Sequence, residues 1–214
     1  MRNFWLLLML ALPASGQWTT NGFGFNFRSS LGYATDPPHT TVVRPGTVMG
    51  YPQSVVVDGI TLVFGWEGAS RTSTAGADRS TAVDARLAGV DYVNVLANFR
   101  VDLPAAGAYT IRLALGDVAG GALSQWATFA DGPTQFAQPA NNVAGTAGNF
   151  IDAAGNMWTT ATWPSGNVAI THTFTTTTFY LHIGGGTGYS AVAHLFIQQG
   201  AGAAPTAVRH RVIQ

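Results

Sequence analysis

The residues best suited to chemistry in this chain are aromatic rings with polar neighbours. A ring offers a flat apolar surface to the C–H face of a sugar, and adjacent Asp, Asn or Arg groups can hydrogen-bond its hydroxyls. Because aromatic residues are also common in cores, any single ring is expected to be buried more often than to bind ligand. The candidates are Trp18, Tyr51, Trp66, Trp126, Trp158, Trp163, Tyr180 and Tyr189.

Two of these rings stand beside features that favour ligand binding. Trp66 ends the apolar run 60–66 and is followed by Glu67, the one Glu of the chain. Tyr189 follows the glycine-rich segment 184–188, where a ligand could approach the backbone closely. We therefore predict that Trp66, Glu67 and Tyr189 bind ligand.

Charged residues are scarce, which gives weight to those that lie near one another. Only 9% of residues are charged, against about 25% in a typical globular protein. Asp78, Arg79, Asp84, Arg86 and Asp117 are open to two interpretations. The first is a partly buried ion-pair network that ties a long loop to the sheet. The second is ligand binding, for which we select Asp78, Arg79 and Asp117.

A structural calcium site built from Asp carboxylates and loop carbonyls is the only cofactor considered, and no calcium-loop motif of fixed spacing is present. We therefore predict no cofactor. On the predicted strands, His182 and His194 could approach each other, but no H-x-H or H-E-x-x-H pattern supports a zinc site. His172 lies in phase with Ile170 and Phe174, which indicates a half-buried, hydrogen-bonded position.

Signatures of common enzymes are missing from the sequence. There is no G-x-S-x-G elbow, P-loop or zincin motif, and no cysteine. A glycosidase pair would need Glu67 together with an Asp, and no spacing argues for that. We predict a non-enzyme, with a hydrolase of unknown type as the lesser alternative.

The first residues resemble an export signal. Arg2 precedes an apolar stretch, and small residues at Ala14 and Gly16 suit cleavage before Gln17. We predict a signal peptide at 1–16, a β-sandwich at 17–199, a small-residue linker with a short tail at 200–214, and a secreted protein. The alternative is an apolar arm retained in an assembly. No later apolar run is long enough for a membrane span, and the formal net charge of +0 gives no general attraction to nucleic acid.

Strand signals dominate the rest of the chain. There are 26 Gly and 12 Phe, and the strong helix formers Glu and Lys are nearly absent. Tyr109, Ile111, Leu113 and Leu115 alternate strictly and are expected to share one face. The pattern predicts an all-β sandwich of about nine or ten strands, including one long strand over 90–103. A helical turn is expected at 82–88.

The connections between these strands are unequal in length. Turn chemistry predicts short turns at 104–107, 131–133 and 164–167, and long loops at 67–89, 117–123 and 138–155. If successive strands alternate in direction, the long loops gather at one end. Binding sites commonly lie on such loops, so we predict the site at that end.

Several motifs resemble one known family. They are Phe25-Asn26-Phe27, Gly50-Tyr51, Phe64-Gly65-Trp66, Asp78-Arg79, Val101-Asp102-Leu103-Pro104 and the strand 109–117 that ends in Gly116-Asp117. This series is similar to the malectin-like and galactose-binding-like modules found beside polysaccharide-degrading enzymes of secreted bacterial proteins. Asn26 stands where that pattern commonly has Asp, and Arg28 stands where it has Gly. Ala105-Ala106 replaces what is frequently a single residue, and the C-terminal half fits by strand pattern alone.

The resemblance implies a jelly-roll β-sandwich that binds a polysaccharide or other glycan without cleaving it. A second hypothesis comes from the Thr-rich strands, the low charge and the basic tail Arg209-His210-Arg211. It is a structural or adhesive subunit of an extracellular or viral assembly, which would associate with itself.

Overall fold

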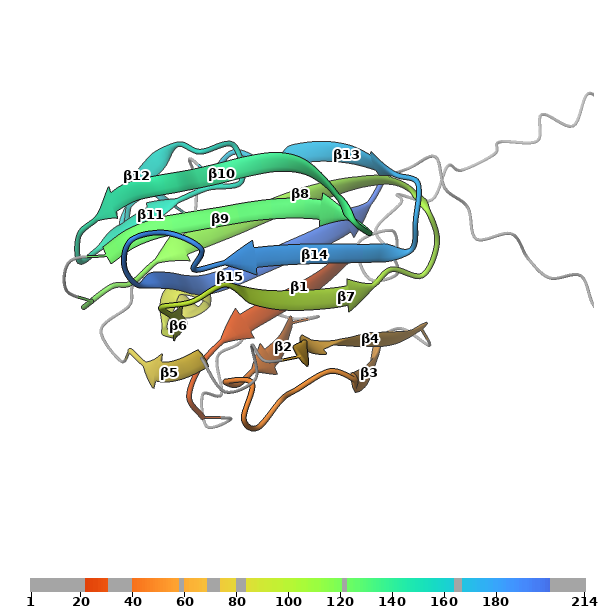
Figure 1. The fold of residues 1–214 in the computed structure, drawn as a ribbon, viewed down its shortest axis with the longest axis horizontal. Coiled ribbons are helices and arrows are strands. Elements are labelled where there is room, and N and C mark those ends of the chain that lie inside the picture. Colours follow the sequence, from red (N-terminus) through yellow and green to blue (C-terminus); the bar gives the residue numbers. More distant parts are fainter. Residues whose placement is uncertain are drawn as a thin grey trace, which may run out of the picture.

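The computed structural model describes residues 22–30, 40–57, 60–68, 74–79, 84–120, 123–163 and 167–200. The predicted signal peptide and nearly all of the predicted linker and tail lie outside these ranges. The described part of the chain is built from two β-sheets packed face to face, so the predicted all-β sandwich is confirmed (Figure 1).

The nine-stranded sheet centres on two long antiparallel strands, β8 and β15. Strands β11 and β13 pair with opposite halves of β8, while β6 and β1 pair with opposite halves of β15. The sheet consists of β1 (Gly22–Phe27), β2 (Thr40–Val43), β5 (Thr74–Asp78), β6 (Gly89–Val93), β8 (Gly107–Gly116), β11 (Asn149–Ile151), β12 (Met157–Thr159), β13 (Ile170–Phe174) and β15 (Ser190–Gln199).

The six-stranded sheet lies in front of it in Figure 1, in the order β10-β9-β14-β7-β4-β3. Every neighbouring pair in this sheet is antiparallel. Its strands are β3 (Gln53–Val57), β4 (Ile60–Trp66), β7 (Ala97–Asp102), β9 (Leu123–Asp131), β10 (Thr134–Gly145) and β14 (Thr178–Ile183).

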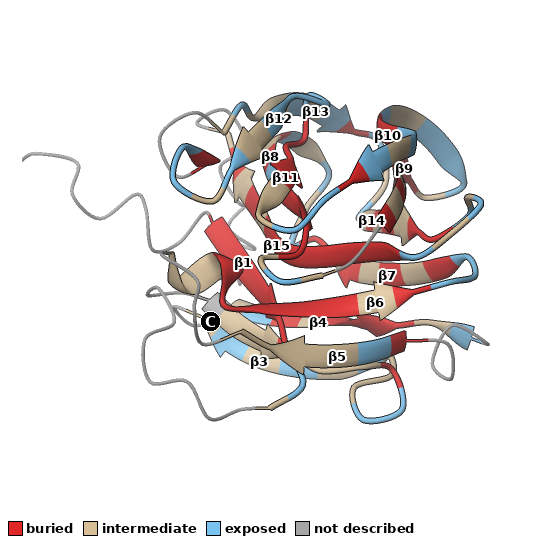
Figure 2. Cartoon of the chain, turned by 90° about the vertical axis from the view of Figure 1, so that its left-hand side faces the viewer, coloured by how far each residue is buried: buried red, intermediate tan, exposed pale blue. Residues whose placement is uncertain are grey.

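The core lies between the sheets because alternate residues of each strand point inward. The predicted face of β8 is confirmed, since Tyr109, Ile111, Leu113 and Leu115 are all buried. Across the interface, the rings of Phe25 and Phe99 meet edge to face with centroids 5.3 Å apart. Figure 2 shows the long strands of both layers as buried along much of their length.

Three expectations about the elements need correction. The strands number more than ten, because short runs such as β2, β3 and β11 pair at sheet edges. The expected strand 90–103 is divided into β6 and β7, which belong to different sheets. The expected loop 138–155 is largely strand, since it contains the end of β10 and all of β11. The helical turn is confirmed as a 3-10 helix at Ala85–Leu87.

The separation of short turns and long loops to two ends is seen only in part, because the predicted turn 164–167 lies mostly outside the described residues and the loops 67–89 and 117–123 are described incompletely. At one end, the Leu103 N–H donates to the Thr177 carbonyl at 2.7 Å, and Asp131 accepts bonds from Thr175 and Thr176. These hydrogen bonds join the turns that follow β7, β9 and β13, so the three turns lie at the same end of the sandwich. At the other end, the loop after β8 contacts Gly148 through the Asp117 carbonyl.

Among the described residues, no helix has both the length and the hydropathy that crossing a bilayer requires.

Candidate functional site

The outer face of the six-stranded sheet carries a cluster of polar and aromatic side chains. Strand alternation turns Asn98, Arg100 and Asp102 of β7 away from the core, because Phe99 and Val101 between them point inward. On β14, Tyr180 and His182 point outward for the same reason. Tyr180 lies directly opposite Arg100 in the sheet, and His182 lies opposite Asn98.

Arg100 is the centre of this cluster. Its Nε donates to Asp102 Oδ1 at 2.7 Å, and its Nη1 donates to Glu67 Oε1 at 2.9 Å. The guanidinium lies over the ring of Tyr51, with Cζ 4.5 Å from the ring centroid. The side chains of Arg100, Glu67 and Asp102 are 26%, 26% and 31% exposed, so a ligand in solvent can reach them. Their geometry is already set by their mutual bonds.

The two tyrosines of the cluster stay neutral at physiological pH. The Tyr51 hydroxyl donates to Asp102 Oδ2 at 2.7 Å, and this hydrogen bond raises the pKa of Tyr51. Burial raises the pKa of Tyr180. Partial burial opposes the charge on Arg100, but the bonds to Glu67 and Asp102 outweigh it and raise the Arg100 pKa. Arg100 therefore remains a cation with two fixed acceptors.

His182 extends the cluster along β14. Its ring stacks on Tyr180 with centroids 5.4 Å apart and planes 12° apart. Nδ1 lies 2.8 Å from Asn98 Oδ1, so we assign the proton to Nδ1, which donates to the amide oxygen. Burial lowers the His182 pKa, so the ring is neutral at pH 7. We call Tyr51, Glu67, Asn98, Arg100, Asp102, Tyr180 and His182 the Arg100 cluster.

A glycine on β4 allows Tyr51 to reach this cluster. Gly65 lies opposite Arg100 and has a φ of 143°. A Cβ at this position would lie 2.7 Å from the Tyr51 backbone nitrogen, which no side chain tolerates. The Tyr51 N–H also donates to the Trp66 carbonyl at 2.8 Å. The Gly65-Trp66 pair thus positions Tyr51 beside Arg100.

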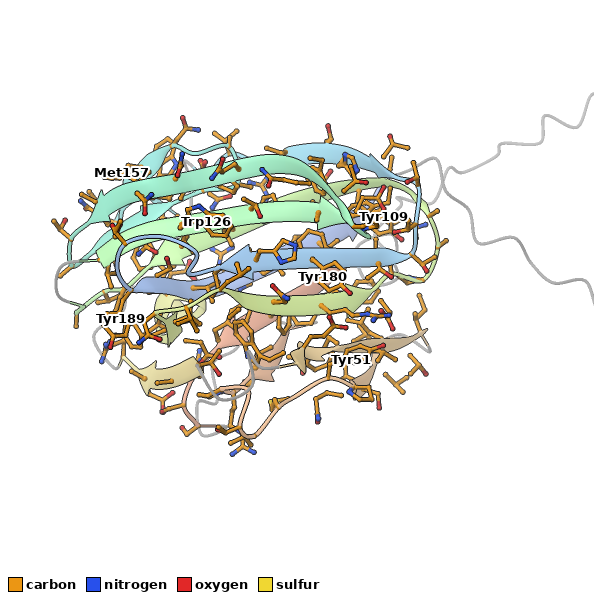
Figure 3. The ribbon with its side chains drawn as sticks, in the orientation of Figure 1. Tyr51, Tyr109, Trp126, Met157, Tyr180 and Tyr189 are labelled. Atoms are coloured by element: carbon orange, nitrogen blue, oxygen red, sulfur yellow. The ribbon has the colours of Figure 1, made fainter. Side chains whose placement is uncertain are left out.

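Trp126 of β9 lies farther along the same face (Figure 3). The glycine-rich segment packs against its indole, since a Cβ on Gly185 would lie 3.2 Å from the ring. Asn142 Oδ1 holds this segment by accepting the Thr187 N–H at 2.9 Å. In Figure 3, Trp126, Tyr180 and Tyr51 follow one another across the front sheet.

The prediction that Trp66 offers a ring to ligand is wrong. Its side chain is 0% exposed, and its ring packs against Phe27 and Phe99 at 5.7 and 5.3 Å. The indole Nε1 donates to the Arg44 carbonyl at 3.2 Å. Trp66 is in phase with Leu62 and Phe64, so its place at the end of the strand does not release it from the core.

The predicted acidic and basic site residues do not form one group. Arg79 donates to both oxygens of Asp117 at 2.8 and 2.6 Å, and Tyr92 contacts both residues. The Asp117 side chain is 0% exposed, so this pair ties the segment after β5 to the loop after β8. Asp78 lies apart from it and accepts the Ser29 hydroxyl at 2.7 Å. These contacts favour the structural interpretation for all three residues.

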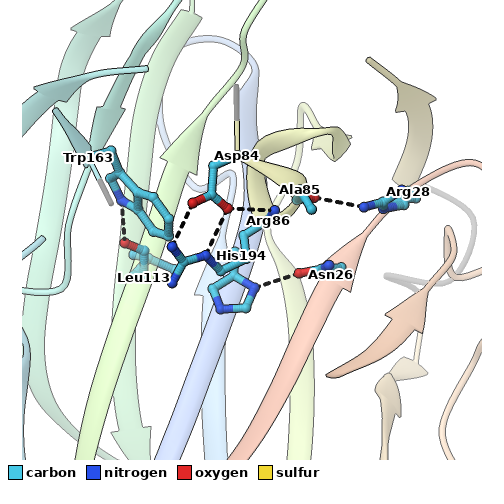
Figure 4. A network of polar contacts seen from close by, with 8 residues as sticks. All are labelled: Asn26, Arg28, Asp84, Ala85, Arg86, Leu113, Trp163 and His194. Atoms are coloured by element: carbon cyan, nitrogen blue, oxygen red, sulfur yellow. Dashed lines mark hydrogen bonds and ion pairs between the residues drawn. The ribbon is translucent and has the colours of Figure 1, made fainter. Parts of the chain in front are cut away.

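A second ion pair lies on the side of the nine-stranded sheet that faces away from the core (Figure 4). Arg86 donates to both oxygens of Asp84 at 2.8 and 2.6 Å, and its guanidinium lies over the Trp163 ring. His194 lies nearby, fully buried, with Nδ1 2.6 Å from Asn26 Oδ1. Burial lowers the pKa of His194 to about 3, so it is neutral at pH 7.

The expected approach of His182 and His194 does not occur, because the two residues lie in different sheets. His172 is half-buried as expected, and its ring stacks on Phe136 with centroids 3.7 Å apart. The expected hydrogen bond is not found at Nε2, which has no such partner among the described residues and lies 3.6 Å from Asp131 Oδ2. Among the described residues, no group of three or more His, Cys, Asp or Glu side chains is placed to hold a metal ion.

Tyr189 is 53% exposed and lies in the connection between β14 and β15. Its carbonyl accepts the Ser124 N–H at 2.9 Å, and no described charged side chain of the predicted site bonds to it. Its role as a ligand-binding residue stays a prediction. Of the six predicted site residues, Glu67 alone belongs to the Arg100 cluster.

Tyr51 and Tyr180 are among the candidate rings of the sequence but are not among the predicted site residues, and Asn98, Arg100 and Asp102 are not predicted to bind ligand. The signal was present, because polar residues alternate with apolar ones at 98–102 and 179–183. In a chain with so few charges, Arg100 and Asp102 on the outward face of one strand are a recognisable pattern. What the pattern does not reveal is that Tyr51 and Glu67 meet them.

No protein-family model matches the chain, and no curated protein matches its sequence. Among solved structures, the plant receptor-like kinase FER matches with a TM-score of 0.47 and 10% identity, over 84% of this chain and 42% of that chain. Bacteroides uniformis β-glucuronidase 2 matches with a TM-score of 0.43 and 11% identity, over 84% and 18%. A carbohydrate-binding module from Cellvibrio mixtus lichenase 5A, in complex with cellotriose, matches with a TM-score of 0.31 and 17% identity, over 60% and 88%. This chain therefore spans less than half of the receptor and glucuronidase chains.

Proposed function

We propose that the protein is a non-catalytic carbohydrate-binding β-sandwich whose ligand lies on the Arg100 cluster. The observation that carries this proposal is the bonding of Arg100 to Glu67 and Asp102, with its guanidinium over the Tyr51 ring and Tyr180 opposite it on the neighbouring strand. The motif resemblance to glycan-binding modules supports the same ligand class.

The chemistry of the cluster suits a sugar. Glu67 and Asp102 supply acceptor oxygens, Arg100 supplies donors, and hydroxyl groups both donate and accept. The two tyrosine rings add apolar area for the C–H face of a pyranose. Because the side chains already hold one another, little conformational freedom is lost on binding.

The arrangement supports binding rather than hydrolysis. A glycosidase needs one carboxylic acid that donates a proton and a second carboxylate across the scissile bond. Here both carboxylates are bonded to the same guanidinium. This geometry suits the orientation of a ligand. It does not suit catalysis, because each carboxylate is held by Arg100 and neither is free to donate a proton to a scissile bond.

The test is affinity gel electrophoresis of the full chain against a panel of soluble polysaccharides, followed by calorimetry with the oligosaccharide of the best binder. Arg100→Ala should abolish retardation of the protein, whereas Val56→Ala, at an exposed position on β3, should not change it. Absence of retardation by every polysaccharide in a broad panel would overturn the proposal. Turnover of any of them would overturn its non-catalytic part.

A further inference from the structure

We infer that Glu67 and Asp102 restrict the ligand to neutral glycans and exclude those that carry carboxylate or sulfate groups. This inference rests on the proposed function and adds a charge selection at the same site. It follows from the balance of charges around Arg100.

The cluster carries two carboxylates and one guanidinium, and its remaining members are neutral. Asn98 has no charge, the raised pKa values of Tyr51 and Tyr180 keep the phenols protonated, and the lowered pKa of His182 keeps the imidazole neutral. The face therefore has a net charge of about −1 at pH 7. A ligand anion placed on it meets net repulsion.

The single cation of the cluster is already paired with both carboxylates. Arg100 directs Nε to Asp102 and Nη1 to Glu67, so two of its donors are already used. A ligand carboxylate that sought the bidentate fork of Nε and Nη2 would have to displace Asp102, because Nε already donates to it. The N–H groups that remain can still donate singly to the hydroxyls of a neutral sugar. The chain contains no Lys that could take over the role.

Three arginines outside the cluster also have their guanidinium groups bonded to other residues. Arg79 pairs with Asp117, and Arg86 pairs with Asp84. Arg112 lies on β8 of the other sheet and donates to the Asn167 carbonyl at 2.6 Å. These three pairs disfavour anion binding at Arg79, Arg86 and Arg112, and we assign the charge selection at the sugar site to Glu67 and Asp102.

The experiment compares a neutral β-glucan with a polygalacturonate and a sulfated galactan as probes for the full-length protein. Wild type should be retarded by a neutral polymer and bind the acidic ones at least about tenfold more weakly. The variant Glu67→Gln/Asp102→Asn keeps the side-chain shapes and changes the cluster charge from about −1 to about +1. It should gain binding to the acidic polymers, and added salt should weaken that new binding.

Asp84→Asn is the matched control, because it removes a carboxylate at the start of the 3-10 helix, away from the Arg100 cluster, and should gain no binding to acidic glycans. Glu67→Gln alone serves if circular dichroism shows that the double variant does not fold. Equal binding of neutral and acidic polymers by wild type would overturn the inference and leave the proposed function standing. If the folded variants still reject acidic polymers, Glu67 and Asp102 do not cause the selection, and the inference is overturned as well. Binding of no glycan at all would overturn both.

Discussion

The Arg100 guanidinium carbon lies over the Tyr51 ring, 4.5 Å from its centroid, while Asp102 accepts a hydrogen bond from each of the two residues. A cation–π contact and two hydrogen bonds thus close a small ring of interactions. Tyr51 precedes β3, and Arg100 and Asp102 belong to β7, so this ring joins segments far apart in the chain.

Replacing Tyr180 by Ala should weaken glycan binding without unfolding the protein. The Tyr180 ring is half-buried on the outer face and stacks on His182, so its loss removes apolar contact from the site. Aromatic contacts of this kind contribute about 0.5–1.5 kcal/mol, which corresponds to roughly a 2- to 12-fold change in affinity. Calorimetry would measure the change. Tyr180→Phe keeps the stacking ring and should bind nearly as well, and affinity unaffected by Tyr180→Ala would contradict the placement of the site.

Arg100→Lys should behave as a loss of the site despite keeping the charge. A lysine ammonium is a flexible point charge and cannot present two fixed donors to Glu67 and Asp102. We expect a fall in affinity of about tenfold or more, since Tyr51 also loses the planar group above its ring. Thermal unfolding followed in parallel should show only a small change, because the residues are partly exposed. Retention of wild-type affinity would show that the charge alone matters.

Trp66→Ala should lower stability rather than ligand affinity per folded molecule. Removal of a large buried aromatic side chain typically costs about 3–5 kcal/mol. Urea unfolding should show this loss, and Trp66→Phe should recover part of it. Calorimetry on the fraction that remains folded separates the two effects. If the Trp66→Phe variant is as stable as the wild type but binds glycan far more weakly, the role of Trp66 is not confined to the core.

Asp91 on β6 should make stability depend on pH. Its side chain is fully buried, and neither carboxylate oxygen has a partner in hydrogen-bond geometry within the part of the chain that the structure describes. Burial raises the pKa of Asp91 well above 3.8, although the Trp66 indole N–H partly opposes this. The folded state therefore binds the proton more tightly than the unfolded chain does. The stability that Asp91 contributes is complete below about pH 4 and is lost as pH rises through the higher folded-state pKa.

Asp91→Asn isolates this effect, because an amide does not titrate. The free energy of unfolding of the wild type, relative to the variant, should fall as pH rises above about 4. At neutral pH the variant should be at least as stable as the wild type. Urea unfolding at a series of pH values measures both curves. A relative stability that rises with pH would mean that a cation neutralises Asp91 in the folded protein.

Tyr189→Ala separates the sheet face from the loop end as the ligand site. Tyr189 is exposed in the connection between β14 and β15, and the Arg100 cluster lies on the sheet face. If the ligand lies only on the Arg100 cluster, this variant should bind like wild type. A loss comparable to that of Tyr180→Ala would show that the loop end also contacts the glycan, as the sequence predicts. Nuclear magnetic resonance titration of both variants would locate each contact.

Both the correct and the incorrect predictions depend on the alternation of side chains within a strand, which reaches only a few residues along the chain. The outward positions of Arg100 and Asp102 could have been derived from the alternation with Phe99 and Val101. The same alternation places Trp66 inside with Phe64, although its position at the end of the strand predicts an exposed ring. The expected strand over 90–103 failed differently, because residues 94–96 carry the chain from one sheet to the other.

The sequence by itself determined the all-β class, the inward faces of the strands and the turn chemistry at one end. These depend on residues two to four apart, whose side chains alternate whatever the rest of the chain does. Only the tertiary structure decided that Tyr51, Glu67 and Arg100 form one cluster. Their meeting depends on the pairing of β4 with β7 and on its register, where a shift of one residue would turn Arg100 into the core.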